Sequence, residues 1–243
     1  ILVGGMNVAE NPIEIRKKIG YLPESNPLYF DMYVREYLLF AASLHQIAKH
    51  KIKDKVEEVI ALTGLQKECH KKIGALSKGY KQRVGLAQAI IHDPEVLILD
   101  EPTSGLDPNQ LAEIRELIKT IGKSKTVMLS THIMQEVEAI CDRVIIINKG
   151  QIVADDTASH LQVDLSHQTV YAEFDGDVAK QALLKIPHVG KVEKVNQGWL
   201  LETTDAIDLR KVIAQYAQQN NLLVLTLKTE EKTLEEVFKE LTH

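Results

Sequence analysis

The sequence has little cysteine, no long hydrophobic run and no excess of positive charge. Its 243 residues include two cysteines, Cys69 and Cys141, which are too few for a disulfide framework and too far apart for a zinc motif. The longest apolar runs, such as Val144-Ile145-Ile146-Ile147, fall far short of the roughly 18 residues that suggest a membrane span. No signal peptide is visible. These absences predict a soluble protein of a reducing, cytosolic compartment.

The charge balance is slightly acidic. Asp and Glu number 34 against 29 Lys and Arg, which gives a net charge of −5. A nucleic-acid-binding surface needs an excess of basic residues to neutralise phosphates, so we do not expect nucleic acid as a partner. Apolar residues make up 44% of the chain and charged residues 26%, which is typical of a globular protein with a buried core.

Apolar bursts alternate with helical patterns over the first 164 residues, which is typical of an α/β sheet with crossover helices. The apolar spacing predicts helices over residues 33–47, 52–60, 79–92 and 111–121. Continuous apolar runs predict buried strands at 96–99, 126–129 and 144–147. We therefore expect one α/β domain over residues 1–164, with a helical subdomain at about 25–92.

A second pattern begins after about Asp164. It predicts strands at 169–174, 189–195, 199–202 and 222–227, and helices at 178–184 and 207–216. The order βαββαβ indicates a small α+β domain of the ferredoxin-like class over residues 165–243. The amphipathic segment 234–241 predicts a terminal helix.

Two adjacent carboxylates follow the apolar run at 97–99. Asp100 and Glu101 come where an open α/β sheet places its ligands, at the carboxyl end of a strand. Carboxylates suit the hard cation Mg²⁺, and a neighbouring carboxylate can accept a proton from an attacking water. The alternative is that both acids merely end a strand and enter a turn.

Further polar segments recur at strand ends and at a helix start. His132 follows the next strand, beside Asp100 and Glu101, where it would donate to phosphate; a solvated histidine is the alternative. The segment 76–83 (LSKGYKQR) offers a hydroxyl, a glycine and the free N–H groups of a helix start, which suit an anion. Taken alone, Ser77 is a simple N-cap, Glu24 belongs to a solvated loop, and 104–108 (SGLDP) is an ordinary loop.

The order and spacing of these segments resemble the ATP-binding subunit of an ABC transporter over residues 1–160. The matching segments are the Q-loop residue Glu24, the signature motif at 76–80, Walker B at 97–101, the D-loop at 104–107 and the switch histidine His132. The resemblance implies a P-loop NTPase-type α/β cassette that binds ATP and Mg²⁺.

Finer features resemble one branch of the ABC-2 exporter group. Residues 20–29 and 31–38 look like the gliding-motility-associated ATP-binding subunit, in which Glu24 replaces the wider family's glutamine. Lys78 and Tyr80 depart from the usual Gly and Gln of the signature. The C-terminal segment also matches the extra domain common in this group, including TLEEVF at 233–238.

The resemblance implies roles for individual residues in a head-to-tail pair of subunits. Asp100 would orient Mg²⁺, and Glu24 would sense metal and water. Glu101 would be the general base, and His132 would contact the γ-phosphate. The segment Ser77-Lys78-Gly79-Tyr80 would bind the ATP of the opposite site, with Ser77 and Gly79 capping its γ-phosphate, and Asp107 would help to couple the two sites.

The resemblance also implies partners and a location. The partners would be transmembrane permease subunits and a second ATP-binding subunit, identical or different, with no nucleic acid. The chain would lie in the cytoplasm, peripheral to the inner face of the cell membrane through the permease. Two alternatives stay open: a catalytically incomplete or regulatory ABC subunit, and a soluble ABC ATPase of DNA repair or translation. The short interval between Glu24 and Ser77 and the acidic charge argue against the second.

One element of a P-loop NTPase is not found in these 243 residues. Such proteins hold phosphate with a G-x-x-x-x-G-K motif followed by Ser or Thr. The nearest segment, GKS at 122–124, has Leu117 at the first glycine position and ends a helix instead of starting one. The resemblance places this Walker A motif upstream of Ile1, so we expect an N-terminally truncated chain that is inactive alone. The alternative is a natural subunit that lends its signature motif to a partner.

Overall fold

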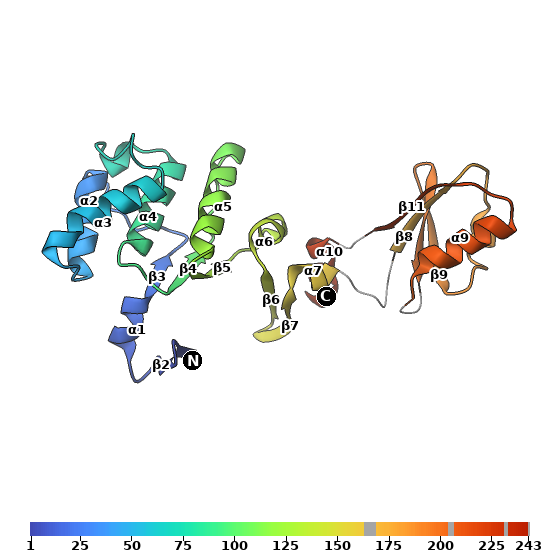
Figure 1. Ribbon diagram of the computed structural model, residues 1–243, viewed down its shortest axis with the longest axis horizontal. Helices are drawn as coiled ribbons and strands as arrows, with labels where there is room; N and C mark the ends of the chain where they lie inside the picture. Colours follow the sequence, from blue (N-terminus) through green and yellow to red (C-terminus); the bar gives the residue numbers. More distant parts are fainter. Residues whose placement is uncertain (163–168, 204–206, 231–232, 243) are drawn as a thin grey trace. The chain divides into compact units, whose positions relative to one another are not determined.

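The computed structural model of the chain describes residues 1–162, 169–203, 207–230 and 233–242. It divides into two compact units, Ile1–Ile140 and Cys141–His243 (Figure 1). The domain boundary predicted between residues 164 and 165 lies outside the described residues. None of the helices in the described part of the chain has the length and apolar character that a membrane span requires.

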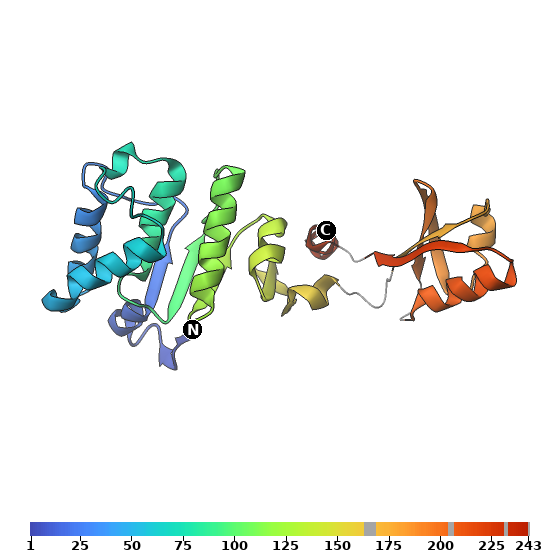
Figure 2. The ribbon, with the colours of Figure 1, turned by 45° about the horizontal axis from the view of Figure 1, so that its top comes forward.

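Unit 1 is built on a three-stranded parallel sheet. The strand order is β3 (Ile19–Leu22), β4 (Val96–Asp100) and β5 (Thr126–Ser130). Figure 2 shows the sheet between the helices of residues 34–90 and helix α5 (Pro108–Gly122). A short hairpin, β1 (Leu2–Val3) and β2 (Met6–Asn7), precedes it. The helices of the unit are α1 (Pro12–Lys18), α2 (Val34–Leu44), α3 (Lys49–Leu62), η1 (Ile73–Ala75), α4 (Lys78–Ile90), α5 (Pro108–Gly122) and α6 (Met134–Ile140).

The helices of unit 1 follow the apolar spacing of the sequence. In α2 the predicted face of Val34, Leu38, Ala41 and Ala42 is buried. Tyr33 is the N-cap of α2, and its backbone N–H donates to the side chain of Glu36. The face predicted for α3 is buried as well, at Val56, Val59 and Ile60. The prediction of these helices is confirmed, with ends that shift by a few residues.

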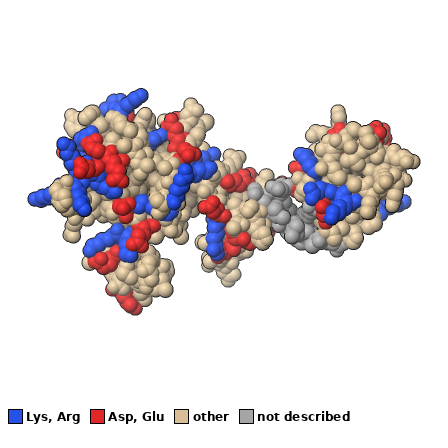
Figure 3. All heavy atoms as spheres, in the orientation of Figure 1, with Lys and Arg blue, Asp and Glu red and all other residues tan. Residues whose placement is uncertain are grey.

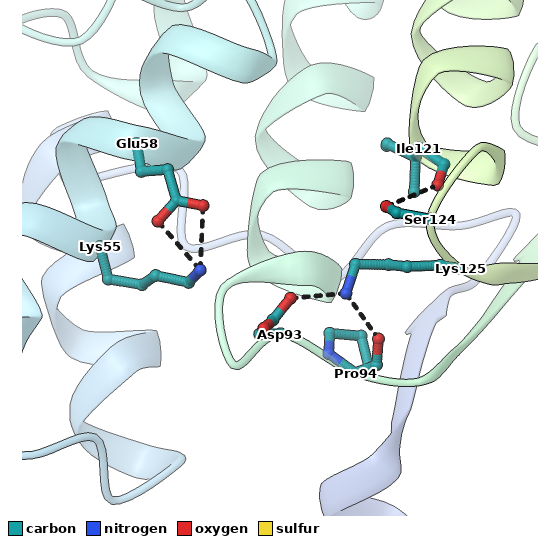
Figure 4. A network of polar contacts seen from close by, with 7 residues as sticks. All are labelled: Lys55, Glu58, Asp93, Pro94, Ile121, Ser124 and Lys125. Atoms are coloured by element: carbon teal, nitrogen blue, oxygen red, sulfur yellow. Dashed lines mark hydrogen bonds and ion pairs between the residues drawn. The ribbon is translucent and has the colours of Figure 1, made fainter.

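The two ends of the sheet differ in chemistry. At the start of β4 and β5, the Lys125 ammonium bonds the carboxylate of Asp93 (2.5 Å) and the carbonyl of Pro94 (2.8 Å), as Figure 4 shows. This network joins the turn after α4 to the turn after α5. On the face of unit 1 shown in Figure 3, basic and acidic side chains lie among one another. The candidate site residues lie at the opposite end, where the strands finish.

Two strands predicted as buried are partly exposed, and the prediction is wrong there. β5 lies at the edge of the sheet and pairs only with β4 among the described strands, which leaves Met128 58% exposed. Among the strands that the structure describes, β6 (Arg143–Asn148) pairs only with β7 (Gln151–Thr157), in an antiparallel hairpin of unit 2. Val144 and Ile146 are buried there, whereas Ile145 and Ile147 are exposed, because one face of a two-stranded hairpin has no cover.

Unit 2 also contains a four-stranded antiparallel sheet. Its strand order is β11 (Val224–Glu230), β8 (Thr169–Phe174), β10 (Gly198–Thr203) and β9 (Val189–Val195). Together with α8 (Lys180–Leu183) and α9 (Leu209–Gln219), the elements follow the order βαββαβ. The terminal helix α10 (Leu234–Thr242) lies against α7 (Ala158–Gln162) and β6, where the Asn148 side chain donates to the Thr242 carbonyl at 3.3 Å.

Candidate functional site

The candidate site lies where β4 and β5 end. Asp100, the last residue of β4, pairs in register with Ser130, the last residue of β5. The backbone N–H of Glu101 donates to the Ser130 carbonyl at 2.9 Å. This register brings residues 130–132 alongside Asp100 and Glu101, as the sequence pattern predicted.

Glu101 and His132 form a close pair at this edge. His132 Nδ1 lies 2.6 Å from Glu101 Oε1, which also accepts the backbone N–H of His132 at 3.1 Å. The Thr131 hydroxyl donates to Glu101 Oε2 at 3.4 Å. The His132 side chain is 78% exposed and that of Glu101 only 16%. The histidine therefore faces solvent while the carboxylate that holds it is set back into the protein.

The pKa of His132 lies above its ordinary value. The largest cause is the hydrogen bond to Glu101, followed by the negative charge of Glu101, with smaller contributions from Glu136 and Glu24. A raised pKa favours the imidazolium form, which donates from both ring nitrogens and suits an anion. Glu24 follows the end of β3, a strand of the same parallel sheet as β4 and β5.

The backbone of Glu101 adopts an uncommon conformation. Its φ of +44° lies in the left-handed region, which residues with a Cβ rarely enter. Such conformations cost on the order of 1–3 kcal/mol and gather at functional sites. The turn closes when the Ser104 N–H donates to the Glu101 carbonyl at 3.2 Å. Six other non-glycine residues of the described ranges also have a positive φ, so the conformation alone does not mark a functional position.

Asp100 offers an available carboxylate at the end of β4. Its side chain has no hydrogen bond or ion pair within the described ranges. No group of three or more His, Cys, Asp or Glu side chains among those residues is arranged to hold a metal. Mg²⁺ is ordinarily held by one or two carboxylates, several waters and substrate phosphates, and not by a full protein cage. The donor set at Asp100 therefore fits Mg²⁺.

Asp107 is the N-cap of α5. Its Oδ1 accepts the backbone N–H groups of Asn109 at 3.1 Å and Gln110 at 3.0 Å. Pro108 occupies the first helical position, where its missing N–H costs nothing. The carboxylate that the sequence placed in an ordinary loop is thus occupied in starting a helix.

Residues 77–80 begin α4. Ser77 is the N-cap and accepts the backbone N–H of Tyr80 at 3.4 Å, as the simple capping interpretation predicted. A Cβ on Gly79 would lie 2.5 Å from Gln110 Oε1, so a side chain fits here only if Gln110 moves. Likewise, a Cβ on Gly105 would overlap Lys78 Nζ.

The predicted site residues thus form two groups. Asp100, Glu101, His132 and Glu24 gather at the strand ends. The segments 77–80 and 105–110 meet at the starts of α4 and α5. Within the described part of the chain, no hydrogen bond joins 77–80 to Glu101 or His132.

Nothing in the sequence pattern indicated one further carboxyl group near this edge. Glu136 on α6 is completely buried; its Oε2 accepts the hydroxyl of Thr103 at 2.5 Å and lies 3.4 Å from the hydroxyl of Thr131. Helical periodicity gives no signal for it, because glutamate in a short helix is ordinarily expected to face solvent.

Comparison with known proteins decides the family. The ABC transporter family model matches residues 1–104. The bacitracin transport ATP-binding protein BcrA of Bacillus licheniformis is 34% identical over 245 residues, which cover 99% of this chain and 78% of BcrA. The chain belongs to the ATP-binding subunits of ABC transporters. These proteins are ATPases.

Other relatives and a solved structure agree with this family. The linearmycin resistance ATP-binding protein LnrL of Bacillus subtilis is 31% identical over all of this chain and 80% of its own. The Nod factor export ATP-binding protein I of Rhizobium sp. (strain N33) is 32% identical over 93% of this chain and 73% of its own. CbiO1 of Clostridium perfringens, part of the ABC transporter complex cbiONQ, superposes with a TM-score of 0.61 at 27% identity and 67% coverage of both chains.

The matched ranges cover the candidate site of this ABC ATP-binding subunit. The ABC transporter match includes Glu24, the segment 77–80 and Glu101. A second family, described as an AAA domain, putative AbiEii toxin, Type IV TA system, matches residues 72–138, which include His132 and Glu136.

Proposed function

We propose that this subunit hydrolyses ATP to power a multi-subunit ABC-2-type membrane exporter. The observation that carries the proposal is the Glu101–His132 pair at the end of β4, with Nδ1 2.6 Å from Oε1. Three relatives of this chain are named for bacitracin transport, linearmycin resistance and Nod factor export. These names support a role in export. A place in gliding motility rests on residues 20–38 alone, and none of the relatives named above carries that description.

In the proposed mechanism Glu101 is the general base. Its carboxylate would accept a proton from the attacking water while the donors from Thr131 and His132 hold its two oxygens. His132, whose pKa is raised by Glu101, would donate to the γ-phosphate. Bound Mg²⁺ would neutralise phosphate charge, with Asp100 and Glu24 as the residues that would hold it; Asp100 would orient it and Glu24 would sense metal and water. Because phosphoryl transfer depends on positioning and charge stabilisation, loss of one positioning group should be severe.

The second group of residues acts, in this proposal, on the ATP of a second subunit. Ser77, Lys78, Gly79 and Tyr80 would cap its phosphates, which agrees with their place at the N-terminus of α4. Asp107 would couple the two sites. Asp107 accepts the backbone N–H of Gln110 at the start of α5, and the Gln110 side chain lies against Gly79. This position supports the coupling.

The proposal includes partners, a location and the C-terminal domain. A second ATP-binding subunit and transmembrane permease subunits would place the chain on the cytoplasmic side of the membrane. We assign residues 165–243 to a ferredoxin-like accessory domain, which the strand order β11-β8-β10-β9 supports. Because the 243 residues contain no G-x-x-x-x-G-K motif, we expect no ATP hydrolysis from this chain alone.

Purification with its partners tests the proposal. We expect a tagged chain to co-purify from membranes with a multi-span permease, and the complex to hydrolyse ATP. Co-purification with ribosomes or DNA, without a permease, would favour a soluble ABC ATPase. A permease complex whose hydrolysis is indifferent to Glu101→Gln in this chain would instead favour a regulatory subunit.

A further inference from the structure

Glu136 is an unusual residue for the interior of unit 1. Its side chain is 0% exposed, and it is the one acidic residue among the buried polar residues that the described ranges contain. Burying a carboxyl group costs free energy unless hydrogen bonds replace its water. Oε1 of Glu136 has no hydrogen-bond partner within those ranges. Burying Glu136 therefore costs free energy that its own hydrogen bonds only partly offset.

Within the described ranges, the side-chain hydrogen bonds of Glu136 go to segments that carry the candidate site. Its Oε2 accepts the hydroxyl of Thr103 at 2.5 Å, and Thr103 lies two residues after Glu101 in the same turn. Oε2 also lies 3.4 Å from the hydroxyl of Thr131, the residue before His132. One buried oxygen thus joins the turn after β4 to the segment after β5.

Thr131 connects the buried glutamate to the exposed pair. Its hydroxyl lies 3.4 Å from Glu101 Oε2 and 3.4 Å from Glu136 Oε2, and it accepts the backbone N–H of Ile133 at 3.2 Å. A hydroxyl has one proton and can donate to only one carboxylate at a time. The position of Glu136 therefore affects the hydrogen bond that Thr131 makes with Glu101.

We infer that Glu136 is a positioning residue for ATP hydrolysis, which anchors Thr103 and Thr131 so that Glu101 and His132 meet. The inference rests on the proposed function. A purely structural role is a poorer account, because an apolar side chain of similar volume fills a buried site without the cost of an unpartnered oxygen. Leucine at position 136 would thus preserve packing and lose both anchors.

Three variants test this inference in the assembled transporter. Glu136→Leu removes both anchors, Glu136→Gln keeps an acceptor oxygen, and Glu138→Gln is the matched control on the exposed side of α6. Misplacement of a catalytic group by about 1 Å costs on the order of 10²-fold in rate. We expect Glu136→Leu to lower kcat by this order with the KM for ATP nearly unchanged, Glu136→Gln to lose less, and Glu138→Gln to match the wild type.

A second readout does not depend on activity. The backbone N–H of His132 donates to Glu101 Oε1, so its hydrogen exchange in the 243-residue chain reports whether the pair is in place. We expect faster exchange in Glu136→Leu and unchanged exchange in Glu138→Gln, with the unfolding free energy of Glu136→Leu equal to or above that of the wild type.

The outcomes separate this inference from the proposed function. A folded Glu136→Leu chain with wild-type kcat and wild-type exchange at His132 would overturn the positioning role. Should Glu136→Leu not fold, wild-type kcat and wild-type exchange at His132 in Thr103→Val, which removes the hydroxyl that Glu136 Oε2 accepts, would do the same. If Glu101→Gln left hydrolysis unchanged, the proposed base would fail, while the exchange experiment would still decide whether Glu136 positions the pair.

Discussion

Replacing Asp107 separates its role as a helix cap from a role of its charge. Its Oδ1 accepts the backbone N–H groups of Asn109 and Gln110 at 3.1 and 3.0 Å. Losing an N-cap acceptor costs about 0.5–2 kcal/mol, and losing a negative charge at a helix N-terminus costs about 0.3–1 kcal/mol. Asp107→Ala loses both, so we expect unit 1 to lose roughly 1–3 kcal/mol. Asp107→Asn keeps an acceptor oxygen and should lose only the charge contribution.

Hydrogen exchange and urea unfolding measure this difference. The amides of Asn109 and Gln110 should exchange faster in Asp107→Ala than in Asp107→Asn, because only the asparagine can still accept them. Urea unfolding followed by far-UV circular dichroism gives the stability. The single tryptophan, Trp199, lies in unit 2, so its fluorescence transition is an internal control that neither variant should shift.

The same pair of variants tests coupling. Asp107→Asn preserves the start of α5, so a loss of hydrolysis in the assembled transporter would be due to the missing charge and not to a frayed helix. If Asp107→Ala left both amides protected and the urea transition unchanged, the capping argument would be refuted.

Two further predictions concern stability. Gly20→Ala should destabilise unit 1 by about 1–3 kcal/mol or more, because a Cβ would overlap the Ala89 carbonyl oxygen on α4. Gly122→Ala, whose Cβ would meet nothing closer than 3.8 Å, should be neutral or stabilise the end of α5; equal urea midpoints for the two variants would contradict this. Acid should destabilise the chain through the stacked rings of His45 and His92, 3.8 Å apart. Burial lowers the pKa of both, and the charge of His45 lowers that of His92 further. The folded state then holds fewer protons than the unfolded chain, so the free energy of unfolding falls as the pH drops below histidine's ordinary range. His92→Gln should flatten that pH profile, and an unaltered profile would exclude the stack as its cause.

The sequence was sufficient to predict the pairing at the strand ends. The apolar run before Asp100 and the run before Ser130 both form parallel strands, and parallel strands end at one edge of a sheet. Glu101 and His132 therefore had to come close, and the structure places them 2.6 Å apart. The apolar faces of α2 and α3 were equally predictable, because helical periodicity reports which side packs against the protein.

Exposure of strands was not predictable from apolar character alone. Met128 and Ile147 lie in apolar runs, yet they are 58% and 64% exposed. Their exposure depends on how many neighbours a strand has, which is a property of the sheet order and not of the local sequence. The burial of Glu136 could not be predicted for a related reason. Thr103 lies far from Glu136 in the sequence. Thr131 lies close to it but next to His132, which the motif already explained. No local pattern therefore signals either contact.

Asp107 has one role in the structure, as a helix cap, and a second role that is only proposed. The sequence motif indicated a role between subunits, and the structure adds two hydrogen bonds within its own helix. Ser77 is similar, since it caps α4 at the segment proposed to bind phosphate. Motif matching alone cannot divide these contributions, which is why variants that keep the cap are needed.

ATP hydrolysis by the assembled transporter, with Glu101→Gln placed in the full-length protein, tests the central claim most directly. Glutamine keeps the size and the hydrogen-bonding oxygen of the side chain but cannot take a proton from water. We predict that turnover is abolished while bound ATP is retained, measured as radiolabelled nucleotide that stays with the purified complex. Near-normal hydrolysis in that complex would contradict the role of Glu101 as the general base.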